Sequence, residues 1–334
     1  MLLVRAMPLD TVEHAREALQ YAIELEHATI PPYLTALYSL KPGTNQAIAQ
    51  LIKSIVFQEM QHMTLAANIL NAIGGEPDVD NKDFVPSYPG GLPFHIGDRN
   101  GQTFEVPLKA FSLDVVETVF MRIEEPDEPI VFPTGTRMRA LQEQFRTIGD
   151  FYRALRARLK AEWFTGDRAR QVTGIVDPVY TLADAQKAID TIIEQGEGTT
   201  TSPLAGPGTQ LAHYYRFAEI FHQRTLVPDS SVKEGYSYTG APIRFDPAGV
   251  WPIVTNPHSG LYPPASIQRA ESDVFNQIYS NLLRALHTTF NGHPDFLDTA
   301  IGLMFDLKLQ ALKLMSIPIG PDTTAAPCYE YVAG

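Results

Sequence analysis

Cysteine is nearly absent from this sequence, which has Cys328 alone among its 334 residues. A single cysteine cannot form an internal disulfide, so nothing indicates an oxidising compartment. No run of about 18 uncharged apolar residues exists either, which argues against a membrane-spanning helix. The apolar N-terminus meets Asp10 and Glu13 at once, which is not typical of a signal peptide. We therefore expect a cytoplasmic protein.

Positive charge is also scarce, because 26 lysines and arginines stand against 38 acidic residues, a formal net charge of −12. This balance argues against a nucleic-acid backbone or an anionic membrane surface as the main partner, and it is compatible with cation binding. Three common catalytic signatures are missing as well: a glycine-rich phosphate loop, a serine nucleophile elbow and a CxxC pair. Since 44% of the residues are hydrophobic, a sizeable core is expected.

Apolar residues recur every three or four positions along most of the chain, which is the pattern of amphipathic helices. The first two helices are joined by a short turn at residues 41–44, so they should lie antiparallel and side by side. Two Pro/Gly-rich stretches, 76–111 and 225–265, are predicted to be long ordered loops. The fold class is all-α, with helices expected near residues 9–40, 45–73, 113–123, 137–163, 182–196, 208–223, 266–290 and 293–315.

Ionisable residues fall on helix faces that should be buried. The apolar face of the first helix contains Glu26, and that of the second contains Glu59 and His62. Glu26 lies 16 residues before Pro42 and Glu59 lies 17 residues after it, so an antiparallel pair places the two carboxylates at nearly the same height. A buried carboxylate is costly unless it is paired or binds a metal.

Glu59 and His62 also form a Glu-x-x-His pair, in which one carboxylate and one imidazole on a single helical turn can reach the same metal ion. The alternative is a buried, hydrogen-bonded polar cluster. His27, beside Glu26, is predicted to be a hydrogen-bonded core histidine rather than a ligand.

A dimetal site needs ligands from two further helices. Glu197 continues an apolar row at the end of its helix, so its partner should lie near the start of the next helix, where His213 stands. A second Glu-x-x-His pair, Glu219 and His222, begins about 16 Å further along that helix at 1.5 Å per residue. This second pair remains an alternative to His213, unless Glu219 and His222 lie on an exposed face. Glu194 remains an alternative to Glu197.

Two of these segments resemble a known family. The strings ELEHATIPPYL at 24–34 and EMQHMTLAANILNAIGG at 59–75 are similar to the ferritin-like domain of the iminophenyl-pyruvate dimer synthase family. That family includes enzymes that couple oxidised tryptophan units on the way to violacein and bisindole alkaloids. Shorter segments at 88–93, 123–126, 195–198 and 213–217 resemble later parts of the family in the same order.

The resemblance implies a ferritin-like bundle with a metal centre. Its carboxylate and histidine positions fall on Glu26, Glu59, His62, Glu197 and His213. The coupling enzymes of the family are much longer chains, so the fold transfers to this chain better than the reaction does.

We therefore predict a single ferritin-like domain over residues 1–334. Its metal-binding helices lie within about 9–74 and 182–224, and an extra C-terminal helix pair lies within about 266–315.

The expected function is that of an oxidoreductase of secondary metabolism that uses O2 or peroxide on a small organic substrate, such as one derived from an amino acid. Two metal ions are expected, with iron first and manganese or zinc as the other possibilities. The alternatives are a non-catalytic metal-binding protein and an imine-coupling enzyme like the longer relatives. Association into a homo-oligomer is possible, but no interface is indicated.

Overall fold

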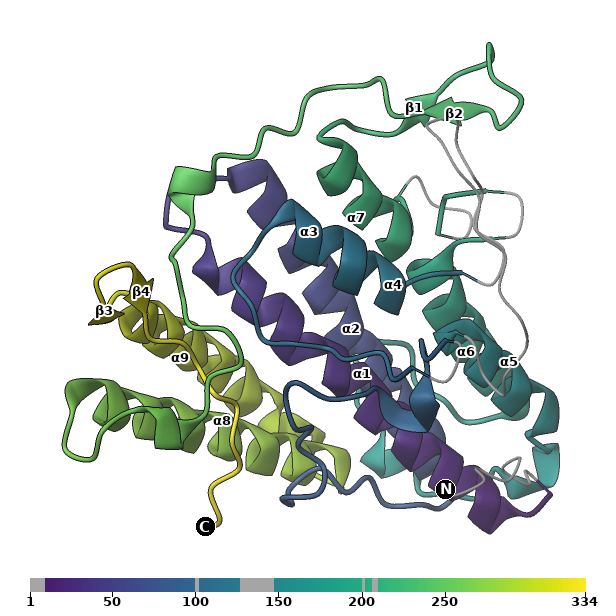
Figure 1. The fold of residues 1–334 in the computed structure, drawn as a ribbon. Coiled ribbons are helices and arrows are strands. Elements are labelled where there is room, and N and C mark those ends of the chain that lie inside the picture. The colour runs from purple at the N-terminus through teal and green to yellow at the C-terminus, as the bar shows by residue number, and fades with distance from the viewer. Residues whose placement is uncertain (1–9, 100–101, 127–146, 200–201, 206–209) are drawn as a thin grey trace.

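The computed structural model describes residues 10–99, 102–126, 147–199, 202–205 and 210–334. Helices dominate this part of the chain, so the predicted all-α class is confirmed (Figure 1). Seven of them have ten residues or more: α1 (Val12–Ser39), α2 (Gln46–Ala72), α5 (Ile148–Arg158), α6 (Leu182–Glu197), α7 (His213–His222), α8 (Ile267–Phe290) and α9 (Leu297–Met315).

The remaining elements are short. Two single-turn helices, α3 (Leu113–Val115) and α4 (Met121–Ile123), flank a π-helical segment at Val116–Phe120. Two small antiparallel hairpins pair β1 (Val227–Pro228) with β2 (Tyr236–Ser237) and β3 (Pro318–Gly320) with β4 (Thr323–Thr324). Single 3-10 turns cover Pro93–His95, Ala161–Trp163, Arg168–Arg170, Pro247–Gly249, Ser259–Leu261 and Pro294–Phe296.

Helix α1 continues through two consecutive prolines, Pro31 and Pro32. Proline has no N–H, so the carbonyl four residues earlier loses its helical donor. For the Ala28 carbonyl, a side chain from the 76–111 loop supplies a donor instead: the Tyr88 hydroxyl donates to Ala28 O over 2.8 Å. The loop thus helps to satisfy the helix at the point where its own ladder is interrupted.

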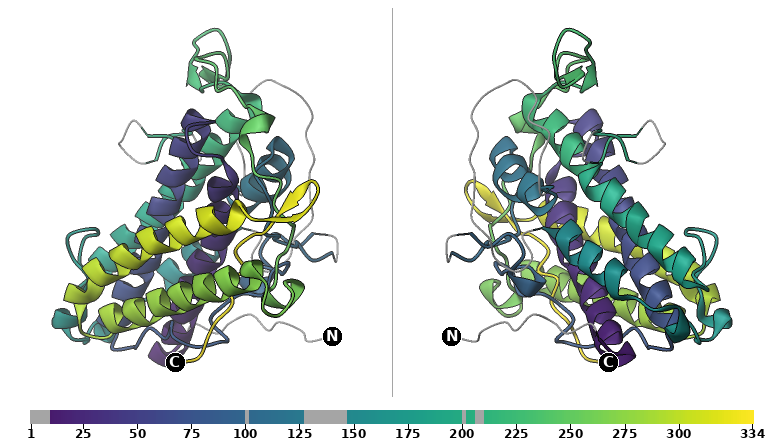
Figure 2. Two further views of the ribbon diagram at one scale, coloured as in Figure 1. Left: turned by 90° about the vertical axis from the view of Figure 1, so that its left-hand side faces the viewer. Right: turned by 90° about the vertical axis from the view of Figure 1, so that its right-hand side faces the viewer.

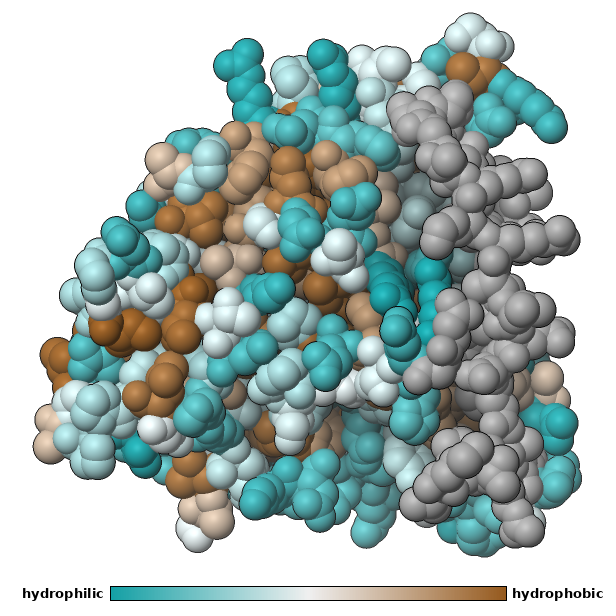
Figure 3. All heavy atoms as spheres, viewed as in Figure 1, coloured by the Kyte–Doolittle hydropathy of each residue, from teal (hydrophilic) through white to brown (hydrophobic). Residues whose placement is uncertain are grey.

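The α1–α2 pair forms the middle of the molecule. Helices α6 and α7 pack against α2, and α5 packs against α6 and α1. Helices α8 and α9 pack against each other and against α1 and α2, as a second layer on another side of the pair (Figures 1 and 2). Side chains coloured as hydrophobic reach the surface over this C-terminal layer (Figure 3). The exposed large hydrophobic residues of α8 and α9 include Ile267, Val274, Phe305 and Leu309.

Two helix boundaries differ from the predicted ones. The helix expected over 137–163 lies in part outside the described residues. Its described portion, α5, begins after Thr147, whose extended backbone and side chain cap the helix, and ends at Arg158. The helix expected from residue 208 begins only at His213, after the extended Ala212. A side-chain cap marks the start of α5 but not that of α7, and the apolar period alone locates neither.

The two long loops brace the helices. Leu108 of the first loop exchanges backbone and side-chain hydrogen bonds with Asn256 of the second.

Among the helices that the structure describes, none combines the length and the apolar character that a membrane span requires.

Candidate metal centre

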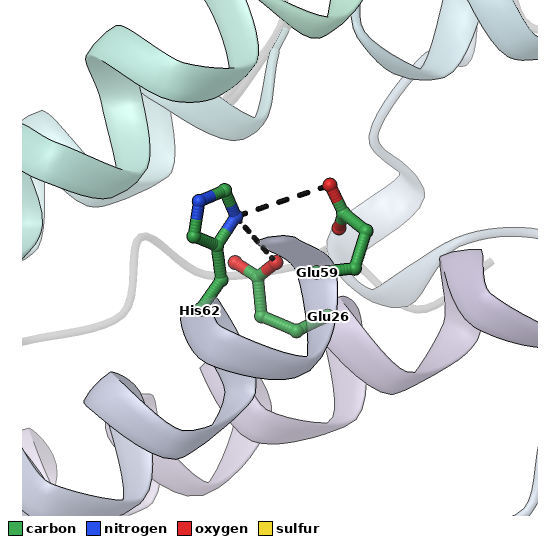
Figure 4. A group of neighbouring side chains, drawn as sticks. All are labelled: Glu26, Glu59 and His62. Carbon is green, nitrogen blue, oxygen red and sulfur yellow. Dashed lines mark ion pairs between the residues drawn. The ribbon is translucent and has the colours of Figure 1, made fainter. Parts of the chain in front are cut away.

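Helices α1 and α2 bring Glu26, Glu59 and His62 together, as the equal-height argument predicts. Figure 4 shows the three side chains pointing toward one another. Nδ1 of His62 lies 3.5 Å from Oε2 of Glu26 and 3.9 Å from Oε1 of Glu59. All three residues are buried, and their ligand atoms lie within 4.8 Å of one another.

A second group shares Glu59 with the first. It consists of Glu59, Glu124 from the end of α4 and His213 from the first turn of α7, again buried and within 4.8 Å. Nδ1 of His213 lies 2.7 Å from Oε1 of Glu59 and 3.4 Å from Oε2 of Glu124. The His62 and His213 rings stack with their centroids 5.4 Å apart, so the two groups are neighbours around one carboxylate.

Each imidazole is oriented by a glutamine. Nε2 of His62 lies 2.8 Å from Oε1 of Gln195, and Nε2 of His213 lies 3.1 Å from Oε1 of Gln58. An amide oxygen accepts only, so each Nε2 carries the proton and each Nδ1 presents a lone pair to the carboxylates. The fully buried His213 Nδ1 lies 2.7 Å from Glu59 Oε1 without meeting hydrogen-bond geometry. Buried nitrogens oriented in this way suit metal ligation.

Hydroxyl groups hold the carboxylates. The Tyr152 hydroxyl donates to Glu26 Oε1 and the Tyr33 hydroxyl donates to Glu124 Oε1, each over 2.5 Å. The Thr29 hydroxyl lies 3.0 Å from Oε2 of Glu59 and donates to it. One oxygen of each carboxylate is thereby fixed, and the other remains directed at the histidines.

Burial and mutual repulsion shift the acidities of these groups. Burial raises the pKa of Glu26 to about 7. Burial and the Glu59 carboxylate raise the pKa of Glu124 as well. Burial lowers the pKa of His62, whereas for His213 the Glu124 and Glu59 carboxylates outweigh burial and raise the pKa. Burial disfavours the ionised state of Glu26 and Glu124, and a bound cation would stabilise that state.

The donor set fits two metal ions. Three carboxylates and two imidazoles are the ligand types that iron and manganese accept, and Glu59 is placed to bridge. The first ion would be held by Glu26, Glu59 and His62. The second would be held by Glu59, Glu124 and His213.

Glu197 belongs to neither group, although it lines the same small cavity as Glu26, Glu59, His62 and Glu124. Its carboxylate accepts from the backbone N–H of Gly149 over 2.8 Å and from Nη1 of Arg153 over 3.3 Å. A Cβ at position 149 would lie 2.3 Å from the Glu197 oxygens, so only glycine allows this approach.

The alternative ligands lie outside both groups. Glu219 is buried, so its alternative interpretation as part of an exposed face is wrong, and its Oε1 accepts from Leu226 N over 2.8 Å. His222 is half-buried and its ring lies 4.3 Å from that of Tyr238. Glu194 is half-buried. His27 is a core histidine, as predicted, with Nε2 2.8 Å from the Tyr279 hydroxyl.

Glu124 is the cluster residue that the sequence argument missed as a ligand. It follows the predicted 113–123 helix, and the segment 123–126 was singled out only for its family resemblance. The structure shows why the helical period does not reveal it, since the π-helical turn at Val116–Phe120 inserts an extra residue before it. Such turns are frequent at functional sites.

A family model matches the part of the chain that carries these two groups. The model described as Ferritin-like covers residues 19–222, more than half of the chain. The chain belongs to the Ferritin-like family. The predicted ferritin-like fold is confirmed, and the narrower resemblance to the iminophenyl-pyruvate dimer synthase family stays a prediction.

A solved structure agrees with this family. The crystal structure of a ferritin like protein from Caulobacter vibrioides is 24% identical to this ferritin-like chain and has a TM-score of 0.63. The likeness covers 96% of this chain and 99% of that chain, and at this identity it shows the fold alone. A search of curated proteins gives no match.

The metal affinity of the ferritin-like centre is expected to decrease as the pH is lowered. Glu26, with a pKa of about 7, is ionised above that pH and must release a proton to bind a cation below it. Between pH 7 and pH 5.5 a Mn²⁺ titration followed by electron paramagnetic resonance should show affinity decreasing about tenfold per pH unit, the slope for one released proton. The raised pKa of His213 acts in the same direction. An affinity that stays constant over this range would contradict the assignment of Glu26.

Proposed function

We propose that this protein is a dimetal-carboxylate oxidoreductase that uses O2 or peroxide to oxidise a small organic molecule. One observation carries the proposal: Glu59 belongs to both three-residue groups, so one carboxylate can bridge two ions. Iron is the metal we favour, since carboxylate and imidazole ligands suit it. A pair of iron ions would supply the electrons that O2 or peroxide takes up.

The protein contributes a small, mostly apolar space beside the ligands. A cavity of about 20 Å³ is bounded by Glu26, Glu59, His62, Glu124 and Glu197 together with Ile123, Ile148, Gly149, Ile192, Ile193 and Gly196. A space of this size holds about one water-sized molecule. It therefore admits only ions or molecules as small as O2 or peroxide, and the isoleucines limit access of bulk water. An organic substrate of any size has to bind elsewhere.

A surface groove offers such a place. It has a volume of about 680 Å³ and is lined by residues of α2, α6 and the 173–180 segment, including Gln61 and Gln195. Gln195 is also the partner of His62 Nε2, so this groove lies one side chain away from the metal groups. We place the substrate here, with Gln195 connecting it to His62.

The test is anaerobic reconstitution with Fe²⁺ followed by addition of O2 or of hydrogen peroxide. The proposal expects an absorbance change that requires oxidant and saturates at about two irons per chain. The same protein loaded with Zn²⁺ is the matched control, because zinc keeps the fold and has no redox chemistry. Bound iron that gives no response to either oxidant would favour the alternative of a non-catalytic metal-binding protein.

A further inference from the structure

A second cavity lies between the α1–α2 pair and the α8–α9 layer. It has a volume of about 100 Å³ and shares no lining residue with the cavity at the metal groups. Its walls are almost wholly apolar, with methionine, leucine and isoleucine side chains from all four helices. Among them are Met60 and Met63 of α2, Leu283 of α8 and Met304 of α9. Phe57 on its rim is 56% exposed, so the cavity reaches the surface there.

One buried polar atom on this cavity has no partner. His27 is 4% exposed and lines the cavity, and its Nε2 is bonded to the Tyr279 hydroxyl. Its Nδ1 has no hydrogen-bond partner among the described residues. Leaving a buried nitrogen unpaired costs free energy, so an unpaired one in a cavity indicates a missing partner.

A second polar group on this cavity is the hydroxyl of Tyr329. Tyr329, 2% exposed, also lines the cavity. Its hydroxyl lies beside Thr35, and the Thr35 hydroxyl itself donates to the Pro31 carbonyl over 2.7 Å. The atom of this cavity that most needs a partner from a ligand is therefore Nδ1 of His27.

We propose that this cavity binds a small neutral aromatic molecule that carries one hydroxyl group. A cavity of about 150 Å³ lined by Leu, Ile and Phe binds benzene, so this smaller cavity, which opens to the surface at Phe57, takes at most a single ring. None of the residues that line the cavity is an aspartate, glutamate, lysine or arginine, so a charged ligand would find no counter-ion. A hydroxyl can donate to or accept from Nδ1, and it therefore fits either neutral tautomer of His27.

This site lies apart from the metal groups, although it adjoins the proposed substrate groove, with which it shares Gln61 and Ile175. It does not require that metals bind, and its ligand would occupy the other side of the α1–α2 pair. The cavity and the metal groups are connected through α1, in which His27 directly follows Glu26.

Phenol is a suitable probe, and toluene is its counterpart without the hydroxyl. The full chain is labelled with ¹³C at the methionine methyl groups and titrated with phenol. Signals from Met60, Met63 and Met304, which line the cavity, are expected to shift. Those from Met121 and Met315, which do not, should stay in place. Failure of the three cavity methionines to shift at millimolar phenol would overturn the proposal.

Substitution of His27 tests the polar contact. In His27→Phe the ring is kept and Nδ1 is lost, so the ratio of phenol to toluene affinity is expected to fall about three- to tenfold, the size of one hydrogen bond. A ratio equal to that of the wild type would show that Nδ1 does not recognise the hydroxyl. Because the wild-type methionine shifts are read independently, a variant that does not fold leaves the proposal testable.

Discussion

Replacing Glu59 by alanine is expected to remove both metal ions. After reconstitution with Fe²⁺ and removal of excess, elemental analysis should find about two irons per wild-type chain and close to none in Glu59→Ala. The reason is that Glu59 belongs to both groups. Without it, one group retains Glu26 and His62 and the other retains Glu124 and His213. Two ligands each are too few to hold an ion through the washing step.

Glu24→Ala is the matched control for this loss. Glu24 lies on the same helix as Glu26, two residues away, but outside both groups, and accepts a hydrogen bond from Gln20 over 3.3 Å. It should keep the full metal content. Circular dichroism of both variants checks that the helices remain. Metal retained in a folded Glu59→Ala protein would show that Glu59 does not bridge.

The second large effect is expected at Glu124. Glu124→Ala should lower the iron content from about two per chain to about one, because only the group with Glu59 and His213 loses a ligand. The ion held by Glu26, Glu59 and His62 keeps all three of its ligands. Elemental analysis gives the stoichiometry directly.

The adjacent residue provides the control for this substitution. Glu125 follows Glu124 in the chain but pairs with Arg99 near the surface. Glu125→Ala should therefore keep about two irons per chain. Equal metal contents in the Glu124 and Glu125 variants would remove Glu124 from the centre and leave the second ion without a defined site.

The part of the centre on α1 and α2 could be predicted from the sequence. Helical periodicity places Glu26, Glu59 and His62 on faces that must be buried, and the short turn between the helices fixes their relative height. Both properties are local, so one sequence suffices. The structure accordingly brings these three side chains together as expected.

The rest of the centre depends on non-local geometry. Glu124 reaches Glu59 only because a short helix with a π-helical turn is held against α7 by the surrounding fold. His213 was predicted from its place at the start of a helix, although that start lies five residues later than expected, at His213 itself rather than at residue 208. Glu197 was placed at the correct helix end. Its carboxylate nevertheless contacts Gly149 and Arg153 of α5, a helix whose start the apolar period does not define.

The most direct test of the dimetal centre is anomalous X-ray diffraction from crystals of the iron-loaded protein. Two anomalous peaks are expected on opposite sides of the Glu59 carboxylate. One should lie beside Nδ1 of His62 and Glu26, and the other beside Nδ1 of His213 and Glu124. A single peak, or peaks that do not contact Glu59, would contradict the account.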